Sequence, residues 1–254
     1  MRSSAVLLGL LGLFAASPLS AQTISYEDVE LDADQFVDGG ERNLPTQWAS
    51  VTPLPAGVAV YGPFRVLDGA RAALVDVTDS ASPAQFAAML RDYPGIAEIE
   101  MIDCPGTEDD LANLRLGRMI REKGIATHVP DGGSVRSGGV ELFLAGARRF
   151  ADPGAEFAVH SWIDDTGLEP DDYAASAPEN RRYIDYYRQM GMSPLEAQAF
   201  YDMTNSVPFE SAKWFGTGVM GLWVNLDRDP AADAGFQGAT SLTLAPRSSN
   251  GARL

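Results

Sequence analysis

The feature that most constrains this fold is a repeated alternation of short apolar segments with helical segments. Strands are expected at residues 58–61, 72–77, 96–103, 125–129 and 155–160. Helices are expected at residues 82–91 and 107–123, and a loop that runs into a helix is expected at residues 135–147. Strands that alternate with helices in this way predict repeated βα units, an α/β domain with a mainly parallel sheet and flanking helices.

The chain after residue 160 is predicted to be mostly helical, with helices at residues 179–189 and 193–203. A further helix is expected at residues 209–218, and residues 219–226 are expected to form a last strand. Residues 58–227 are therefore assigned to one domain. It is preceded by an extension at residues 22–57, whose start forms either an edge strand or an irregular lead-in, and followed by a flexible tail at residues 228–254.

The first 21 residues have the pattern of a secretory signal peptide. Arg2 supplies the positive start, residues 5–16 form the apolar run, and small residues precede Gln22. This run is shorter than the roughly 20 residues that span a bilayer, although an uncleaved anchor is the alternative interpretation. A lipoprotein signal would need a cysteine after the cleavage point, whereas the single cysteine is Cys104. We therefore expect an exported protein, periplasmic or extracellular, with no stable membrane insertion after cleavage.

The charge of the chain excludes some classes of function. A formal net charge of −16, without a cluster of lysine and arginine, disfavours nucleic acid and anionic lipid as partners. No metal site and no cofactor are expected. Because the chain has only two histidines, His128 and His160, the search for a general base is short.

Ser137 is the candidate nucleophile, because it is followed by two glycines and opens an apolar helical segment. Glycines permit close approach of the backbone to a substrate, and the start of a helix offers free N–H groups to a developing oxyanion. The alternative is that Ser137 only caps the helix, since serine is a favoured N-cap residue. His160 and His128 each end an expected strand, so position alone does not choose the base. The turn at residues 104–107 could supply backbone N–H groups, or could be an ordinary βα turn.

Four blocks of the sequence, in this order, resemble the proteolytic subunit of the Clp protease, within the wider crotonase-like group. They are the Asp-Cys-Pro-Gly-Thr turn at 103–107, the Ser-Gly-Gly segment at 137–146, the strand at 149–160 and the segment at 210–219. The resemblance spans residues 70 to 222. It implies a Clp-protease/crotonase-like fold of repeated ββα units and the activity of a serine hydrolase.

The resemblance also implies roles for individual residues. Ser137 is similar to the nucleophile and His160 to the general base of that family, and Gly138, with Gly106 or Thr107, is similar to its oxyanion donors. For the third triad member the sequence offers Asn205, which is preferred, and Asp202. Two departures from the family pattern are Thr107, where the family has glycine, and an acidic insertion at residues 164–172, which forms either a lid or, as we expect, a solvated loop.

The expected function is that of an exported serine peptidase, or another hydrolase of acyl substrates, that acts through an acyl-enzyme. A weak or inactive Clp-like binding module is the main alternative. A Ser–Lys pair would need Lys123 or Lys213, and neither has obvious reach to Ser137. An acyl-thioester enzyme would need basic residues for coenzyme A, and the sequence gathers none. Homo-oligomerisation is plausible, because the resembled family forms rings.

Overall fold

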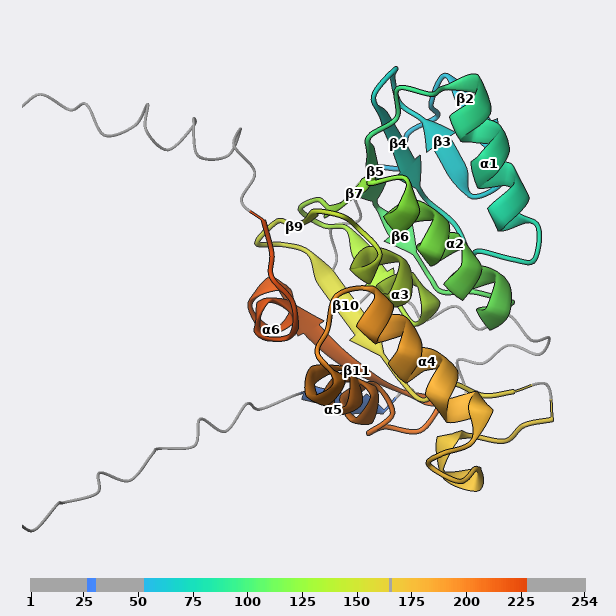
Figure 1. Ribbon diagram of the computed structural model, residues 1–254. Helices are drawn as coiled ribbons and strands as arrows, with labels where there is room; N and C mark the ends of the chain where they lie inside the picture. Colours follow the sequence, from blue (N-terminus) through green and yellow to red (C-terminus); the bar gives the residue numbers. More distant parts are fainter. Residues whose placement is uncertain (1–26, 31–52, 165, 228–254) are drawn as a thin grey trace, which may run out of the picture.

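The strands form two sheets in a computed structural model that describes residues 27–30, 53–164 and 166–227 (Figure 1). The six-stranded sheet has the order β2-β3-β4-β5-β7-β9, formed by Ala59–Tyr61, Phe64–Val66, Arg71–Leu74, Glu98–Met101, Ala126–Val129 and Arg149–Ala151. The five-stranded sheet has the order β1-β11-β10-β8-β6, formed by Glu27–Glu30, Ser211–Gly216, Glu156–Val159, Ser134–Arg136 and Asp103–Cys104.

From β5 to β10, consecutive strands alternate between the two sheets, and this alternation creates the repeated unit. Strand β5 lies in the six-stranded sheet and β6 in the other, and the pairs β7–β8 and β9–β10 follow the same rule. All neighbouring strands among β4, β5, β7 and β9 pair in parallel, as do β6, β8 and β10. Helices follow the pairs, and these ββα units confirm the predicted α/β class with mainly parallel sheets and flanking helices.

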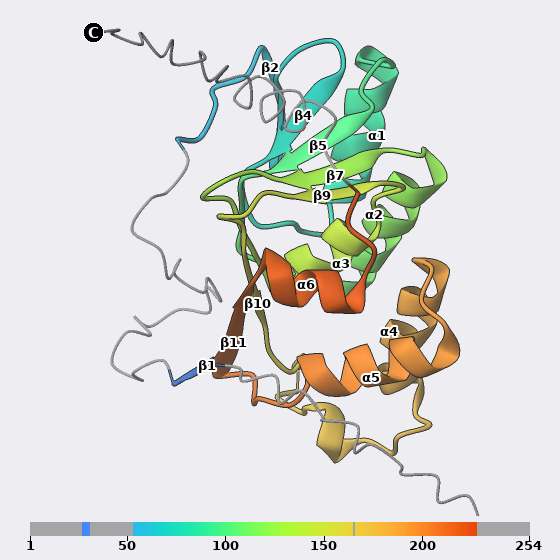
Figure 2. The same cartoon turned by 90° about the vertical axis from the view of Figure 1, so that its left-hand side faces the viewer.

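Six helices accompany the sheets in the described residues: α1, Ser82–Asp92; α2, Asp110–Glu122; α3, Gly138–Leu144; α4, Pro178–Gln189; α5, Pro194–Thr204; and α6, Thr217–Trp223. Figure 2 shows α1 and α2 against one side of the six-stranded sheet, with α4 and α5 side by side further down the molecule. The predicted capping box opens α5, because Ser193 accepts from the Glu196 amide while Glu196 accepts from the Ser193 amide. Sheet residues and helix residues share one large hydrophobic core.

The parallel strands β6, β8 and β10 place their carboxyl ends side by side. Cys104 pairs with Val135, and Arg136 pairs with Ala158, so the segments that follow these strands leave the same edge of the sheet. These segments contain Gly106, Ser137 and His160. Because ligands bind outside the carboxyl ends of parallel strands in open α/β sheets, this edge is the expected place for a site.

Four sequence-based assignments are wrong in detail. The expected helix at 209–218 and strand at 219–226 are in fact the strand β11 followed by the helix α6. In β11, Ala212 and Trp214 face one side of the sheet while Phe215 stacks on Phe157 of β10 on the other, so pairing with β10 and β1 outweighs local helix propensity. The segment at 210–219, the fourth block of the Clp resemblance, is therefore mainly a strand and not the expected helix. The strand expected at 96–103 is two strands, and the loop expected before α3 contains β8.

Several predictions fall partly or wholly outside the described residues. The signal peptide at 1–21, the tail at 228–254 and most of the extension at 22–57 stay predictions, apart from β1, which pairs with β11 as an edge strand. No helix among the described residues is long and apolar enough to cross a membrane.

Candidate active site

Ser137 occupies a sharp turn between β8 and α3. Its φ is 49° and its ψ is −126°, and among the described residues it is the one non-glycine residue with a positive φ. Its side chain makes no capping hydrogen bond to α3, which contradicts the interpretation of Ser137 as a simple helix cap. Such a backbone conformation costs about 1–3 kcal/mol, and strain of this kind is concentrated at functional sites. The turn resembles a nucleophile elbow, in which the serine hydroxyl is held away from the backbone.

The turn after β6 packs directly against the serine. A Cβ placed on Gly106 would lie 3.1 Å from Ser137 Cβ and 3.5 Å from its Oγ, and the φ of Gly106 is 138°. The Gly106 carbonyl accepts a hydrogen bond from the Thr78 amide at 3.1 Å, and Thr78 also bonds to the Asn113 side chain. These bonds fix the Gly106 peptide beside Ser137. Because a side chain here would crowd Ser137 and would need an unfavourable positive φ, the position requires a glycine.

Gly138, at the start of α3, packs closely against Thr107 of the turn after β6. Asn113 Nδ2 donates to the Gly138 carbonyl at 2.7 Å, and a Cβ on Gly138 would lie 2.7 Å from Thr107 Cγ2. The Thr107 methyl group therefore fills the space beside Gly138. Its hydroxyl accepts from the Asp109 amide at 3.1 Å, which holds the start of α2 to the turn.

His160 follows β10 and lines the same cleft as Ser137. Its Nδ1 lies 2.8 Å from the carbonyl oxygen of Ser161, and its ring packs edge-on against Phe209 with centroids 4.8 Å apart. A carbonyl oxygen only accepts, so Nδ1 carries the hydrogen in this bond. The lone pair is then on Nε2, as a general base requires.

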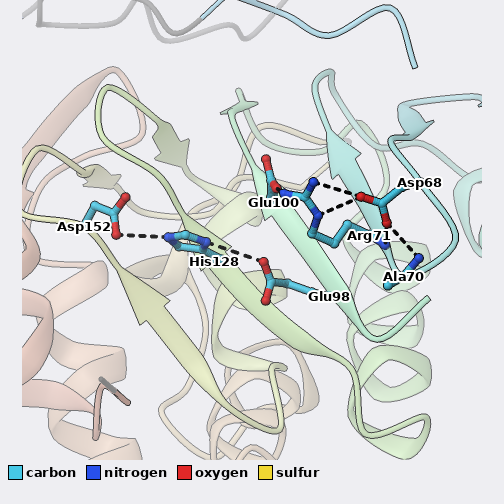
Figure 3. A network of polar contacts seen from close by, with 7 residues as sticks. All are labelled: Asp68, Ala70, Arg71, Glu98, Glu100, His128 and Asp152. Carbon is cyan, nitrogen blue, oxygen red and sulfur yellow. Dashed lines mark hydrogen bonds and ion pairs between the residues drawn. The ribbon is translucent and has the colours of Figure 1, made fainter. Parts of the chain in front are cut away.

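The second histidine is engaged elsewhere (Figure 3). His128 on β7 has Nε2 3.0 Å from Asp152 Oδ1 and Nδ1 3.5 Å from Glu98 Oε1, so both ring nitrogens face carboxylates. Arg71 on β4, which β5 separates from β7, bridges Asp68 and Glu100 in the same view. His128 is not among the described residues that line the cleft. The structure thus distinguishes the two histidines where strand position did not.

The two candidates for the third triad position differ in placement. Asn205 ends α5 and lines the cleft, and its Oδ1 lies 3.4 Å from the Trp162 amide while Nδ2 donates to the Tyr201 carbonyl at 2.7 Å. Asp202 is exposed and accepts from Gln198 on its own helix, so it is directed away from the cleft. The position that a triad carboxylate would take at His160 Nδ1 is filled by the neutral Ser161 carbonyl.

We expect Asn205→Ala to slow any reaction at Ser137 on the order of tenfold, because Asn205 anchors the segment next to His160 and misplaced catalytic groups react slowly. Asp202→Ala is expected to have little effect, since its partner is a surface glutamine. Rates of serine labelling of the two variants, measured side by side, check this. A larger loss in Asp202→Ala would make Asp202 the third member instead.

The cleft holds two acidic residues that the sequence patterns do not single out, Glu141 and Asp110. Glu141 lies one helical turn after Ser137 on α3, is 9% exposed, and accepts a 2.7 Å hydrogen bond from the Tyr187 hydroxyl. Burial raises the pKa of Glu141 to about 7. A glutamate inside the apolar run of residues 140–145 is the sequence signal that could have revealed it, since buried carboxylates are rare.

The acidic insertion is a folded loop. Asp164 accepts hydrogen bonds from the amides of Thr166 and Leu168, and Glu169 accepts from the Phe209 amide at 3.2 Å. The segment includes a 3₁₀ turn, Pro170–Asp172, and residues 166–168 are exposed. The loop thus braces one wall of the cleft through Phe209.

The two lysines of the alternative Ser–Lys pair and the single cysteine lie elsewhere. Lys213 is buried on β11 and donates to the Ser206 hydroxyl, and Lys123 is exposed at the end of α2. Cys104 is buried, and burial raises the pKa of its thiol, which suits a structural residue. None of the three is among the described residues that line the cleft.

Comparison with known proteins gives a limited result. No family model matches the chain, and no curated protein matches it. Among solved structures the chain is similar to a mutant of the 1510-N membrane-bound stomatin-specific protease in complex with a substrate peptide, at 16% identity and a TM-score of 0.42, covering 64% of this chain and 75% of that chain. A second mutant of this protease gives 16% identity and a TM-score of 0.40, covering 62% and 83%. The functional proposal therefore rests on the geometry of the site.

Proposed function

We propose that this protein is a serine hydrolase, with a peptide bond as the preferred substrate and Ser137 as the nucleophile. The observation that carries the proposal is the positive φ of Ser137. The Ser137 hydroxyl does not cap α3, and Ser137 lines a cleft together with His160. A strained serine that lines the same cleft as a histidine, next to a glycine turn fixed in place, matches the needs of acyl transfer. The resemblance of residues 103–107, 137–146 and 149–160 to the Clp protease supports the same function.

The mechanism assigns each of these groups a role. His160 Nε2 accepts the proton of the Ser137 hydroxyl as Oγ forms a bond to the substrate carbonyl carbon. The negative carbonyl oxygen is stabilised by the N–H of Gly138 and by an N–H of the turn at Gly106 or Thr107. The bond to the leaving amine then breaks, and the amine takes the proton from His160. Water attacks the acyl-enzyme with His160 again as base, which releases the acid and restores Ser137.

The orientation of His160 by a neutral carbonyl limits the expected rate. An aspartate at Nδ1 would stabilise the imidazolium that forms during the reaction, whereas the Ser161 carbonyl supplies only a hydrogen bond. The proposed enzyme is therefore slower than a hydrolase with a full triad. This feature also favours the second candidate function, a binding module that holds peptides in the same cleft.

Export and assembly belong to the proposal as well. Cleavage before Gln22 would deliver the protein to the periplasm or the medium, and the intact mass of the protein recovered from these fractions checks it. Homo-oligomerisation rests on the resemblance to a ring-forming family, and light scattering of the purified protein checks it.

The test is labelling of the purified protein with a fluorophosphonate, in which Ser137 Oγ displaces fluoride from phosphorus. We expect the wild type to be labelled, Ser137→Ala to lose all labelling, and His160→Gln to lose it by about 100-fold or more. His128→Gln is the matched control, because it makes the same substitution at the histidine that lies outside the cleft. We expect it to retain labelling.

Two outcomes would contradict the hydrolase proposal. Equal loss in His128→Gln and His160→Gln would mean that labelling follows general stability and not the base. A folded wild type that is not labelled would favour the second candidate function, the binding module. A peptide-binding measurement on the same sample would then test that function.

A further inference from the structure

The walls of the cleft next to Ser137 are acidic and aromatic. Asp110 begins α2, Glu141 lies on α3, and the described residues that line the cleft include no lysine or arginine. Tyr183 and Tyr187 of α4, together with Trp162, also line the cleft. Carboxylates combined with aromatic faces are the groups that bind organic cations in proteins.

Two tyrosine hydroxyls hold the carboxylates in place. Tyr187 donates to Glu141 Oε1 at 2.7 Å, and Tyr183 donates to Asp110 Oδ2 at 2.8 Å. Both tyrosines are buried, and the Tyr183 ring stacks on Trp162 with centroids 5.9 Å apart and an angle of 15°. The carboxylates are therefore positioned by α4 before any ligand arrives, which lowers the entropic cost of binding.

Glu141 keeps the capacity to accept further hydrogen bonds from a ligand. Its side chain is nine-tenths buried, and the Tyr187 hydroxyl takes one lone pair of Oε1. A carboxylate offers about four lone-pair sites on its two oxygens, so the Tyr187 hydroxyl and the backbone N–H of Glu141 do not saturate it. Because Glu141 lines the cleft, this capacity serves a group that enters it. A buried carboxylate favours a cationic partner, since ionisation without one is unfavourable in that environment.

We infer that the cleft selects substrates with a lysine or arginine side chain next to the bond that Ser137 attacks, and that Glu141 and Asp110 bind the cationic group. This inference rests on the proposed function and adds the class of substrate to it. Glu141 follows Ser137 by one turn of α3, so a side chain held at Glu141 belongs to a residue close to the reacting carbonyl. Trp162 and Tyr183 would contact the aliphatic part of a lysine or arginine side chain.

The ionisation of Glu141 gives the selectivity a pH dependence. Burial raises the pKa of Glu141 to about 7, the Tyr187 hydrogen bond opposes this rise, and nearby Asp110 adds a smaller increase. A bound cation favours the ionised form and lowers this pKa. Preference for a cationic side chain should therefore increase as the pH rises through about 7. Asp110, His160, Tyr183 and Tyr187 are the other titratable groups that line the cleft. Taking the ratio of two substrates cancels the effect of His160, which acts on both.

The experiment compares two diphenyl phosphonate probes that differ only in their side chain, lysine in one and norleucine in the other. Ser137 Oγ displaces phenol from phosphorus in both cases. We expect the lysine probe to label the wild type at least about tenfold faster. In Glu141→Gln and in Asp110→Asn this ratio should fall toward one, because each amide keeps an oxygen for its tyrosine and loses the charge. The rate of each variant with a fluorophosphonate reports the reactivity of its serine separately.

The outcomes separate the inference from the proposed function. If the wild type reacts with the fluorophosphonate but labels equally fast with the lysine and norleucine probes, the inference is overturned and the hydrolase proposal stands. The same holds if Glu141→Gln and Asp110→Asn both keep the wild-type ratio of the two labelling rates. If the wild type does not react at all, binding of Nα-acetyl-lysine amide, whose side-chain ammonium is free, and of Nα-acetyl-norleucine amide to Ser137→Ala, followed by NMR, tests the cleft without chemistry. Preferential binding of the lysine amide supports an acidic pocket that binds cationic side chains, and equal binding or none overturns it.

Discussion

Replacing Gly106 by alanine is expected to lower the labelling rate of Ser137 by about 100-fold or more. The new Cβ would lie 3.1 Å from Ser137 Cβ, and a φ of 138° is one that residues with a side chain rarely adopt. The Gly106 peptide must therefore rotate or shift, although its carbonyl is bonded to the Thr78 amide. Either movement displaces an N–H proposed to stabilise the oxyanion, and loss of one such donor costs about 10²–10³ in rate. Fluorophosphonate labelling over time measures this directly.

Gly124→Ala is the matched control for this prediction. Gly124 also has a positive φ, 67°, but it follows α2 and no atom lies within 4 Å of a Cβ placed there. Its replacement carries the backbone cost of a left-handed alanine, about 1 kcal/mol in unfolding free energy, without touching the site. We expect it to keep wild-type labelling. Equal losses of labelling in the two variants would show that the glycine turn acts through stability alone.

The location of the candidate site could be predicted from the sequence because it depends on local signals. The apolar segments that end near Cys104 and at His160 alternate with helices, and the glycines at 106 and 138 mark turns. Parallel strands necessarily place such ends at one edge of a sheet. Gly106, Ser137 and His160 accordingly follow the neighbouring strands β6, β8 and β10.

Other features depend on contacts that no local pattern contains. The segment at 211–216 becomes a strand because β10 and β1 are available to pair with it, although its local sequence pattern predicts a helix. The division of 96–103 between two sheets depends on how β5 and β6 each find a partner strand. The acidic wall of the cleft depends on tyrosines of α4 that bind Asp110 and Glu141, through hydrogen bonds between residues 73 and 46 positions apart.

The buried arginine before the nucleophile is expected to be the most important charged residue for stability. Arg136 is 3% exposed; its Nη1 donates to Ser134 Oγ at 2.6 Å and its Nη2 to Asp103 Oδ1 at 2.7 Å. Ser134 in turn donates to Glu156 Oε1 at 2.6 Å. Arg136→Met would remove the buried cation that pairs with the partly buried Asp103 and connects through Ser134 to the buried Glu156. Breaking a buried pair in this way costs about 3–5 kcal/mol. Urea denaturation measures the loss.

Arg71→Met supplies the comparison, since Arg71 also contacts two carboxylates but its side chain is 50% exposed. Solvent screens such a pair, so we expect a loss within about 1 kcal/mol. Similar losses in the two variants would contradict the assignment of Arg136. If the larger loss is observed, adding Glu156→Gln to Arg136→Met should recover part of it, because a buried charge then disappears together with its cation. The bonds from Arg136 and Ser134 connect β8 to β6 and β10. These three strands lead to Gly106, Ser137 and His160, so Arg136 would stabilise the fold and also keep the three site segments aligned.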